Sequence, residues 1–202
     1  MPRPSLTTEQ KREIRRNIRQ AAAKIYAEQG VKSITARAVA NEAGVSVGTI
    51  YSYFDGLSGL LQSLWREPMR RLVRQMVEAT DAIESPRERL KKLLTMYVEF
   101  SRVQESVFRS AFLFVRPESV PAPEQIALKE DRFFQLFANT IRDGQKQGQF
   151  RSGNANKLTQ TVLSAVHGSL ALPINLHRLA LDDSPQVARN MIDVMLEWLE
   201  AA

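Results

Sequence analysis

The sequence has no cysteine and only two histidines, His167 and His177. Without cysteine the chain can hold no disulfide, thiol nucleophile, iron–sulfur cluster or cysteine-ligated zinc. A lone histidine in a helical stretch is more often packed or solvated than a metal ligand, so we expect neither a metal site nor a cofactor. The absence of disulfides is typical of a reducing compartment.

Long apolar runs are also missing. None reaches the roughly 18 residues of a membrane span. Residues 1–16 contain no apolar segment of the kind found in signal peptides. We therefore expect a cytoplasmic protein with no membrane partner. Its 202 residues are 44% hydrophobic and 25% charged, which is enough for one or two small domains with real cores.

The positive charge is concentrated at the N-terminus. Residues 1–24 carry seven Lys or Arg and two Glu, a net charge of +5 out of +6 for the whole chain. An anionic partner is expected to meet this end of the protein. A solvated basic tail is the alternative interpretation.

Apolar residues recur with helical spacing along the chain and strand alternation is absent, which predicts an all-α fold. The first helix is expected from about Thr8 to Gln29, with a capping box formed by Thr7 and Gln10 and a stop at Gly30. Its apolar stripe consists of Ile14, Ile18, Ala21, Ala22, Ile25 and Tyr26. The basic residues Arg12, Arg15, Arg16 and Arg19 lie mostly off this stripe and should face water or a phosphate backbone.

Two short helices follow, joined by a tight turn. Thr35 is a good N-cap for a helix that ends at Ala43, and a second helix is expected over Val47–Phe54. Only Gly44-Val45-Ser46 separates them, and Gly44 tolerates the backbone angles of such a turn. The small side chain of Ala40 allows close crossing of the helices. This pattern predicts a helix-turn-helix.

Longer helices are predicted for the remaining sequence. Proline at position 68 should kink the first, and a Ser85-Pro86-Arg87-Glu88 capping box should start the second. The expected helices cover about 57–77, 86–97, 107–115, 126–141, 154–181 with a break or bend near Pro173, and 184–200, and residues 116–123 form a loop.

Residues 34–54, ITARAVANEAGVSVGTIYSYF, resemble the DNA-binding signature of TetR-family transcriptional regulators, and the match extends from Lys11 to beyond Leu64. The resemblance implies a three-helix DNA-binding domain over 1–56 and a helical effector-binding and dimerisation domain over 57–202. It further implies a non-enzymatic, sequence-specific regulator, more often a repressor, that binds a palindromic operator in double-stranded DNA.

The candidate DNA-binding residues lie on and around the second helix of the motif, because a major groove admits one α-helix. They are Thr35, Arg37, Ser46, Val47, Gly48, Thr49, Tyr51, Ser52 and Tyr53. The resemblance implies phosphate or sugar contacts for Thr35, Tyr51 and Tyr53, and a base contact for Arg37. Core packing is the alternative for the two tyrosines.

Two features depart from the family pattern. Leu57 stands where many members carry a phosphate-binding lysine, and no Lys, Arg, Asn or Gln occurs between Val45 and Phe54. The strongest base readers are therefore missing from the recognition helix. We expect binding that depends steeply on salt and discriminates modestly at each base pair.

Two other functions fit parts of the sequence. Gly44-Val45-Ser46-Val47-Gly48 matches the G-x-S-x-G elbow of serine hydrolases, with Ser46 as nucleophile, but that elbow follows a β-strand and the residues before it are helical in pattern. A helical adaptor without operator specificity is the other alternative.

The last two helices should form a homodimer by analogy with the family. Their wide apolar face supports this, and Ala165, Gly168 and Ser169 allow close helix approach. The apolar face consists of Val187, Met191, Ile192, Val194, Met195, Trp198 and Leu199. An intramolecular core helix is the alternative.

A small hydrophobic or aromatic effector would bind where aromatic and methionine side chains converge. The candidate lining residues are Trp65, Met69, Met96, Tyr97, Phe100, Phe108, Phe112, Phe133, Phe137 and His167, with Arg109 as a further polar anchor. By analogy with the family, effector binding would favour a spacing of the two recognition helices that no longer fits DNA.

Overall fold

The computed structural model describes residues 6–30, 33–113, 127–176, 178–182 and 185–200. These residues form helices and no β-strand, apart from an isolated antiparallel bridge between Phe150 and Glu200. The helices are α1 (Thr8–Gln29), α2 (Ala36–Ala43), α3 (Val47–Tyr53), α4 (Gly56–Thr80), α5 (Pro86–Val103), α6 (Glu105–Phe112), the 3-10 turn η2 (Leu128–Glu130), α7 (Arg132–Lys146), α8 (Ala155–Asn175) and α9 (Pro185–Leu199). The all-α prediction is confirmed.

The chain divides into two compact units. One comprises Met1–Pro68 with Arg109–Glu124, and the other Met69–Phe108 with Gln125–Ala202. Helix α4 runs from Gly56 to Thr80 and includes Pro68, which has no backbone N–H to donate. The kink expected there stays a prediction.

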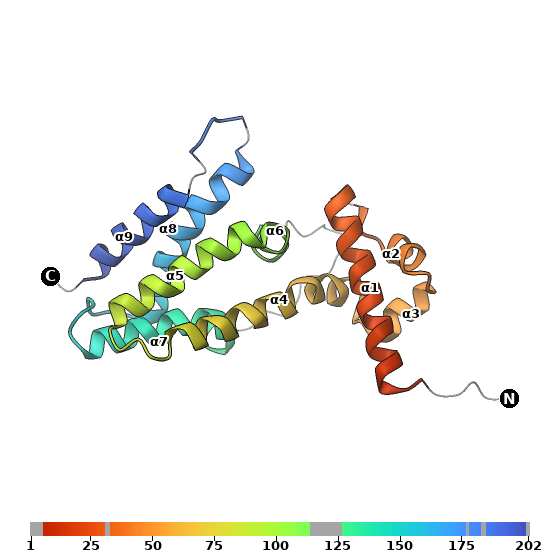
Figure 1. Ribbon diagram of the computed structural model, residues 1–202, viewed down its shortest axis with the longest axis horizontal. Coiled ribbons are helices and arrows are strands. Elements are labelled where there is room, and N and C mark those ends of the chain that lie inside the picture. Colours follow the sequence, from red (N-terminus) through yellow and green to blue (C-terminus); the bar gives the residue numbers. More distant parts are fainter. Residues whose placement is uncertain (1–5, 31–32, 114–126, 177, 183–184, 201–202) are drawn as a thin grey trace. The chain divides into compact units, whose positions relative to one another are not determined.

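The first unit is a trihelical head built on a buried core. Figure 1 shows α1 running across α2 and α3. The core takes side chains from all three helices and from the first turns of α4: Ile18, Ala22, Ile25, Val39, Ala40, Ala43, Ile50, Phe54, Leu60 and Leu61. Burial of this apolar surface is the main contribution to the stability of the head.

Local capping fixes the helix ends of the head. The Thr7 hydroxyl accepts from the Gln10 N–H at 3.2 Å, and the Gln10 side chain accepts from the Thr7 N–H at 2.8 Å, which is the expected capping box. The Thr35 hydroxyl accepts from the Ala38 N–H at 3.0 Å. Gly44, with φ of +65°, ends α2 in the left-handed conformation. The predicted bounds of α1 and α2 are confirmed.

The second unit packs α5, α7, α8 and α9 around one core, and the four helices lie together in Figure 1. Its fully buried residues include Leu90, Leu93, Leu94, Phe137, Ile141, Val166, Ile192 and Leu196. The Arg89 guanidinium donates to the Ile83 carbonyl at 2.8 and 2.9 Å and to Asp143 at 3.1 Å, which ties the start of α5 to the end of α7. The Arg151 N–H donates to the Leu199 carbonyl at 2.7 Å and anchors the end of α9.

Some predicted helix bounds need correction. The helix expected over 154–181 ends at Asn175, two residues beyond Pro173, whose missing N–H weakens the helix at that turn. The helix expected from 126 begins at Arg132, where Asp131 accepts from the Phe134 N–H at 2.8 Å as its cap. The predicted loop 116–123 and Ile126 lie outside the described residues. Within the described part of the chain, every helix is too short or too polar to cross a bilayer.

Candidate nucleic-acid interface and effector site

Helix α3, the predicted recognition helix, is held by one buried side chain and exposes most of the others. Ile50 is completely buried and anchors the helix in the head core. Val47 and Tyr51 are large hydrophobic residues that nevertheless remain exposed. The exposed fraction of Tyr51 is 57%. A tyrosine that packed in the core would be buried, so the core-packing interpretation fails for Tyr51.

Hydrogen bonds between neighbouring side chains order the start of α3. The Ser46 hydroxyl accepts from the Thr49 N–H at 3.0 Å, and the two hydroxyl oxygens of Ser46 and Thr49 lie 2.8 Å apart. Ser52 donates to the Thr49 carbonyl at 2.9 Å. Ser46 is thus the N-cap of the helix. Gly48 adds no side chain to the exposed turn, so a ligand can approach the backbone there.

The other predicted DNA contacts divide into exposed and packed residues. Thr35 and Arg37 are exposed at the start of α2. Tyr53 is half-buried and packs against the head core, as does Leu57, which stands at the usual lysine position. Tyr53 therefore contributes to packing as well as presenting part of its ring to the surface.

Most basic residues of α1 have partners within the head. The Arg15 guanidinium lies 4.9 Å from the centre of the Phe54 ring, a cation–π contact. Lys24 donates to Glu42 at 2.7 Å, and that hydrogen bond and the charge of Glu42 raise the pKa of Lys24. These two residues link α1 to the helix-turn-helix, a role that the sequence analysis did not identify.

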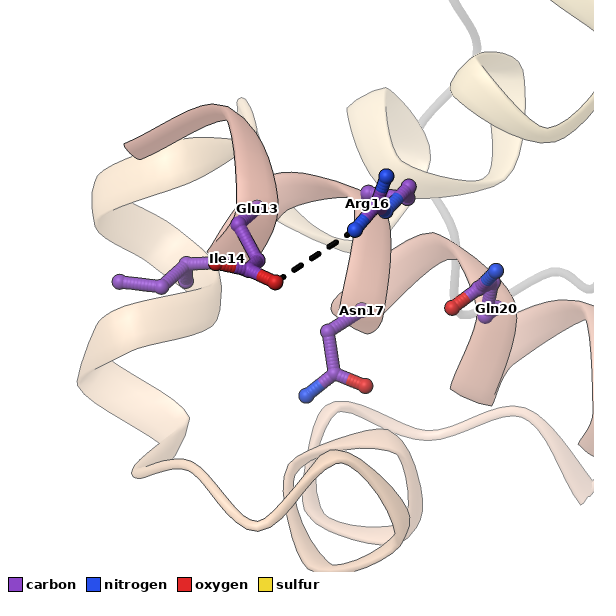
Figure 2. A pocket seen from close by; sticks show the side chains of 5 residues that line it. All are labelled: Glu13, Ile14, Arg16, Asn17 and Gln20. Atoms are coloured by element: carbon purple, nitrogen blue, oxygen red, sulfur yellow. Dashed lines mark hydrogen bonds and ion pairs between the residues drawn. The ribbon is translucent and has the colours of Figure 1, made fainter. Parts of the chain in front are cut away.

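A shallow depression of about 350 Å³ lies along one face of α1. Figure 2 shows Glu13, Ile14, Arg16, Asn17 and Gln20 around it, with Arg16 bonded to Glu13 at 3.5 Å. Asn17 donates to the Ala43 carbonyl at 2.9 Å and so caps the end of α2. Arg12 likewise pairs with Glu9 at 3.5 Å. Both ion pairs are exposed, so they leave the two arginines available to a stronger anion.

The serine-hydrolase alternative is wrong. Residues before Ser46 form helix α2 and a left-handed turn at Gly44, where the nucleophile elbow requires a β-strand. The Ser46 hydroxyl is occupied as a helix cap.

Aromatic residues predicted for the effector site converge in the second unit. Tyr97 of α5 lies 5.8 Å from Phe108 of α6 and 5.5 Å from Phe133 of α7, measured between ring centres. The Tyr97 hydroxyl and Nδ1 of His167 on α8 are 2.8 Å apart. Phe133 contacts Phe137 at 5.1 Å. We refer to Tyr97, Phe108, Phe133, Phe137 and His167 as the aromatic cluster.

Burial affects the two titratable members of the aromatic cluster in opposite directions. It raises the pKa of the Tyr97 hydroxyl and lowers the pKa of His167, because the charged form of each group loses hydration. Both side chains are therefore neutral near pH 7. The described residues contain no group of three His, Asp or Glu side chains placed to bind a metal ion.

The remaining predicted effector residues are placed on α4, α5 and α6. Phe100 is buried on α5, and Met96 and Met69 are half-buried on α5 and α4. Arg109 is exposed and Phe112 is half-buried, both on α6. The Trp65 side chain lies outside the described residues. Their role as ligand contacts stays a prediction.

The apolar residues predicted to form one face of α9 divide into a buried set and an exposed set. Ile192, Leu196 and Leu199 point into the core of the second unit. Val194 and Trp198 remain exposed, by 52% and 36%, and Leu172 of α8 by 51%. A Cβ atom built at Gly168 of α8 would meet nothing within 4 Å, so there is open space beside this helix.

Comparison with known proteins identifies both parts of the chain. Residues 18–64 match the profile of "Bacterial regulatory proteins, tetR family", and residues 83–170 match "Tetracyclin repressor-like, C-terminal domain". These two matched segments contain the helix-turn-helix and the whole aromatic cluster.

Individual relatives are also regulators by name. The chain is 23% identical to the fatty acid metabolism regulator protein of Bacillus subtilis over 76% of this chain and 79% of that protein. It is 31% identical to the HTH-type transcriptional regulator BetI 1 of Chromohalobacter salexigens, but that match spans only half of each chain.

The fold is shared with a solved transcriptional regulator from Saccharomonospora viridis in complex with choline. The TM-score is 0.66 at 26% identity, with 95% of this chain and 100% of that chain covered. With both segments matched and the architecture shared, the chain belongs to the tetR family of bacterial regulatory proteins, which are DNA-binding transcriptional regulators.

Proposed function

We propose that this chain represses transcription by binding a palindromic operator as a homodimer, and that a small apolar or aromatic effector releases it from DNA. The observation that carries the proposal is α3, where Thr49 and Tyr51 lie on a rigid, capped helix anchored by Ile50. Such a helix fits a major groove, and at the start of α2 Thr35 can reach the adjacent backbone and Arg37 a base. Bacterial operators lie in the cytoplasm, where the protein would act.

Dimerisation is proposed through α8 and α9. Val194 and Trp198 of α9 and Leu172 of α8 are exposed apolar side chains, and the open space at Gly168 allows close approach of a partner helix. Two symmetric recognition helices would then read two operator half-sites.

Effector binding is proposed at the aromatic cluster. Its buried rings and its one hydrogen-bonded polar pair have the composition of a small-molecule site. The choline complex of the Saccharomonospora viridis regulator supports a small organic ligand, and the name of the Bacillus subtilis relative points to fatty acid metabolism. The protein would leave its operator if the effector binds more tightly to a conformation whose two recognition helices are not spaced to fit successive major grooves.

The test is binding of the purified protein to DNA from upstream of its own gene, followed by fluorescence anisotropy at several salt concentrations. Thr49→Ala and Tyr51→Ala should each weaken specific binding about tenfold or more, because both lose contacts at the groove. Val77→Ala truncates an apolar residue on α4 that is 44% exposed, and is the control. Unchanged operator affinity in both α3 variants, with normal thermal stability, would disprove the assignment of α3.

A further inference from the structure

Helix α1 contacts the chain on both sides of α3. Before α3, the Asn17 side chain donates to the carbonyl of Ala43, the last residue of α2, at 2.9 Å. After α3, the Arg15 guanidinium lies over the Phe54 ring, 4.9 Å from its centre, and Phe54 is the C-cap of α3. Two side chains that are two positions apart on α1 therefore hold the two ends of the segment that contains α3.

Arg15 differs from its neighbours on α1 because it has no carboxylate partner. The residues three and four positions away, which its side chain can reach along the helix, are Lys11, Arg12, Ile18 and Arg19. Arg12 and Arg16, by contrast, each pair with a glutamate three positions earlier. Within the described part of the chain, the Arg15 guanidinium makes no hydrogen bond and no ion pair. Its five N–H donors are therefore left for water or for an anion.

Arg15 is the middle of a cationic row on α1, which we define as Lys11, Arg15 and Arg19. Residues four positions apart share one face of a helix and are about 6 Å apart along its axis. Lys11 and Arg19 also make no ion pair with any residue that the structure describes. Like charges at this spacing destabilise a helix, and an anion bound along the cationic row would relieve their repulsion.

The contact with Phe54 prepares Arg15 to bind such an anion. Phe54 is only 4% exposed and is part of the head core, so its ring is a fixed support, whereas Arg15 is exposed. The ring attracts the cation but takes up none of its hydrogen-bonding capacity for an oxygen acceptor. The planar guanidinium can then bind two phosphate oxygens at once, and a side chain already held in place loses less rotamer entropy on binding.

We propose that the cationic row binds one DNA backbone strand beside the groove that α3 enters, with Arg15 as its central phosphate contact. Because Arg15 also lies on the C-cap of α3, a phosphate bound there secures the position of α3 as well as adding affinity. This inference rests on the proposed function in taking duplex DNA as the partner. It deepens that function, because it assigns to one residue of α1 both a backbone contact and the positioning of α3.

The experiment measures the affinity of full-length variants for a duplex from upstream of the gene and for a duplex of unrelated sequence, by fluorescence anisotropy at several salt concentrations. Arg15→Gln should weaken operator binding at least about tenfold and make the slope of log K against log salt shallower by about 0.9, because one phosphate contact is lost. Arg74→Gln removes the same charge from an exposed position on α4 and is the control. Equal losses in the two variants, or an unchanged slope in Arg15→Gln, would overturn the phosphate contact.

Arg15→Lys separates positioning from charge. Lysine keeps the positive charge but lacks the planar guanidinium, so the salt slope should stay within about 0.3 of wild type. The ratio of operator affinity to unrelated-DNA affinity should fall at least about threefold, because α3 is held less firmly. Arg16→Lys is the matched control, because Arg16 pairs with Glu13 and, among the described residues, lies over no aromatic ring. An unchanged ratio in Arg15→Lys, or the same fall in both lysine variants, would show that Arg15 does not position α3.

Thr49→Ala, measured beside these variants, separates this inference from the proposed function. If Thr49→Ala loses operator affinity while the Arg15 variants match their controls, the assignment of α3 stands and the cationic row is wrong. If the wild-type protein does not distinguish the two duplexes, the operator-binding proposal fails, and the salt slope of Arg15→Gln on either duplex still decides whether Arg15 binds a phosphate.

Discussion

Gly144 shows how strongly one residue can be constrained by its neighbour. A Cβ atom built there would lie 2.1 Å from Cδ2 of Phe150, whose ring is buried between α7 and the end of α9. Because that ring has little room to move, Gly144→Ala should lower the free energy of unfolding by about 1–3 kcal/mol. Urea denaturation measures the change, and a variant as stable as wild type would contradict this account of the packing.

Gly48 is the opposite case and supplies the control. A Cβ atom there would be 3.7 Å from the Ser46 hydroxyl, which is ordinary contact, and the residue lies in a helix without positive φ. Gly48→Ala should therefore raise the free energy of unfolding by about 0.5–1 kcal/mol. The same methyl group would stand between α3 and a DNA groove, so operator affinity should fall at least about tenfold. Anisotropy titrations that show unchanged affinity would argue against close backbone approach at this position.

His167 predicts a dependence of stability on pH. Its pKa is lowered in the folded protein, so below the ordinary value of 6.5 the unfolded chain binds a proton that the folded chain does not. The free energy of unfolding should fall as the pH drops from about 6.5 towards the lower pKa of His167 in the folded protein. Above pH 6.5, His167 should cause no pH dependence of stability. Denaturant titrations of wild type and His167→Gln at each pH isolate the effect. Parallel pH profiles for the two proteins would show that His167 does not contribute.

At the scale of helices, α1 packs against the helix-turn-helix, and we expect its exposed Arg16 to contact DNA phosphates as well. Arg16 and Glu13 are 64% and 68% exposed and 3.5 Å apart, so their pairing adds little to stability. Glu13→Gln should leave the free energy of unfolding within about 0.5 kcal/mol of wild type. By freeing Arg16 for a phosphate, it should tighten operator binding and steepen the dependence of log K on log salt by about one unit.

Glu78→Gln is the control for that change, because Glu78 is exposed on α4 and its loss alters the net charge equally. If both variants change operator binding by the same amount, the effect comes from overall charge and the role of Arg16 in α1 is wrong.

Some helix starts were predictable from a local capping signal, whereas the start of α7 was placed too early although Asp131 caps it. The Thr7 capping box and the Thr35 cap gave the correct starts of α1 and α2, because these bonds join residues three positions apart. The end of α8 was placed too late, because leucines continue at helical spacing to Leu181 although the helix ends at Asn175, where the Leu176 N–H donates to the Leu172 carbonyl at 2.9 Å.

The α3 site was easier to predict from the sequence than the aromatic cluster, because local sequence signals are easier to read than tertiary contacts. The exposed residues of α3 follow from a short motif with fixed spacing. The pairing of Tyr97 with His167 joins residues 70 positions apart, and the cation–π contact of Arg15 with Phe54 also depends on tertiary packing. A sequence can propose the aromatic residues of a cluster, but the partners of each ring follow from how the helices pack.

At the scale of the whole molecule, the proposed function requires assembly into a symmetric dimer. Val194 is 52% exposed on the outer face of α9, and in the proposed dimer it would be buried twice, once from each copy. Val194→Arg should then place two like charges against each other across the two-fold axis and convert the dimer to monomer in sedimentation velocity at micromolar concentration. Operator affinity should fall at least about a hundredfold, because one half-site alone retains only part of the contacts.

Val77→Arg introduces the same charge at a site with 44% exposure on α4 and should remain dimeric. A dimer that persists in Val194→Arg would move the interface away from α9 and require another surface to space the two recognition helices.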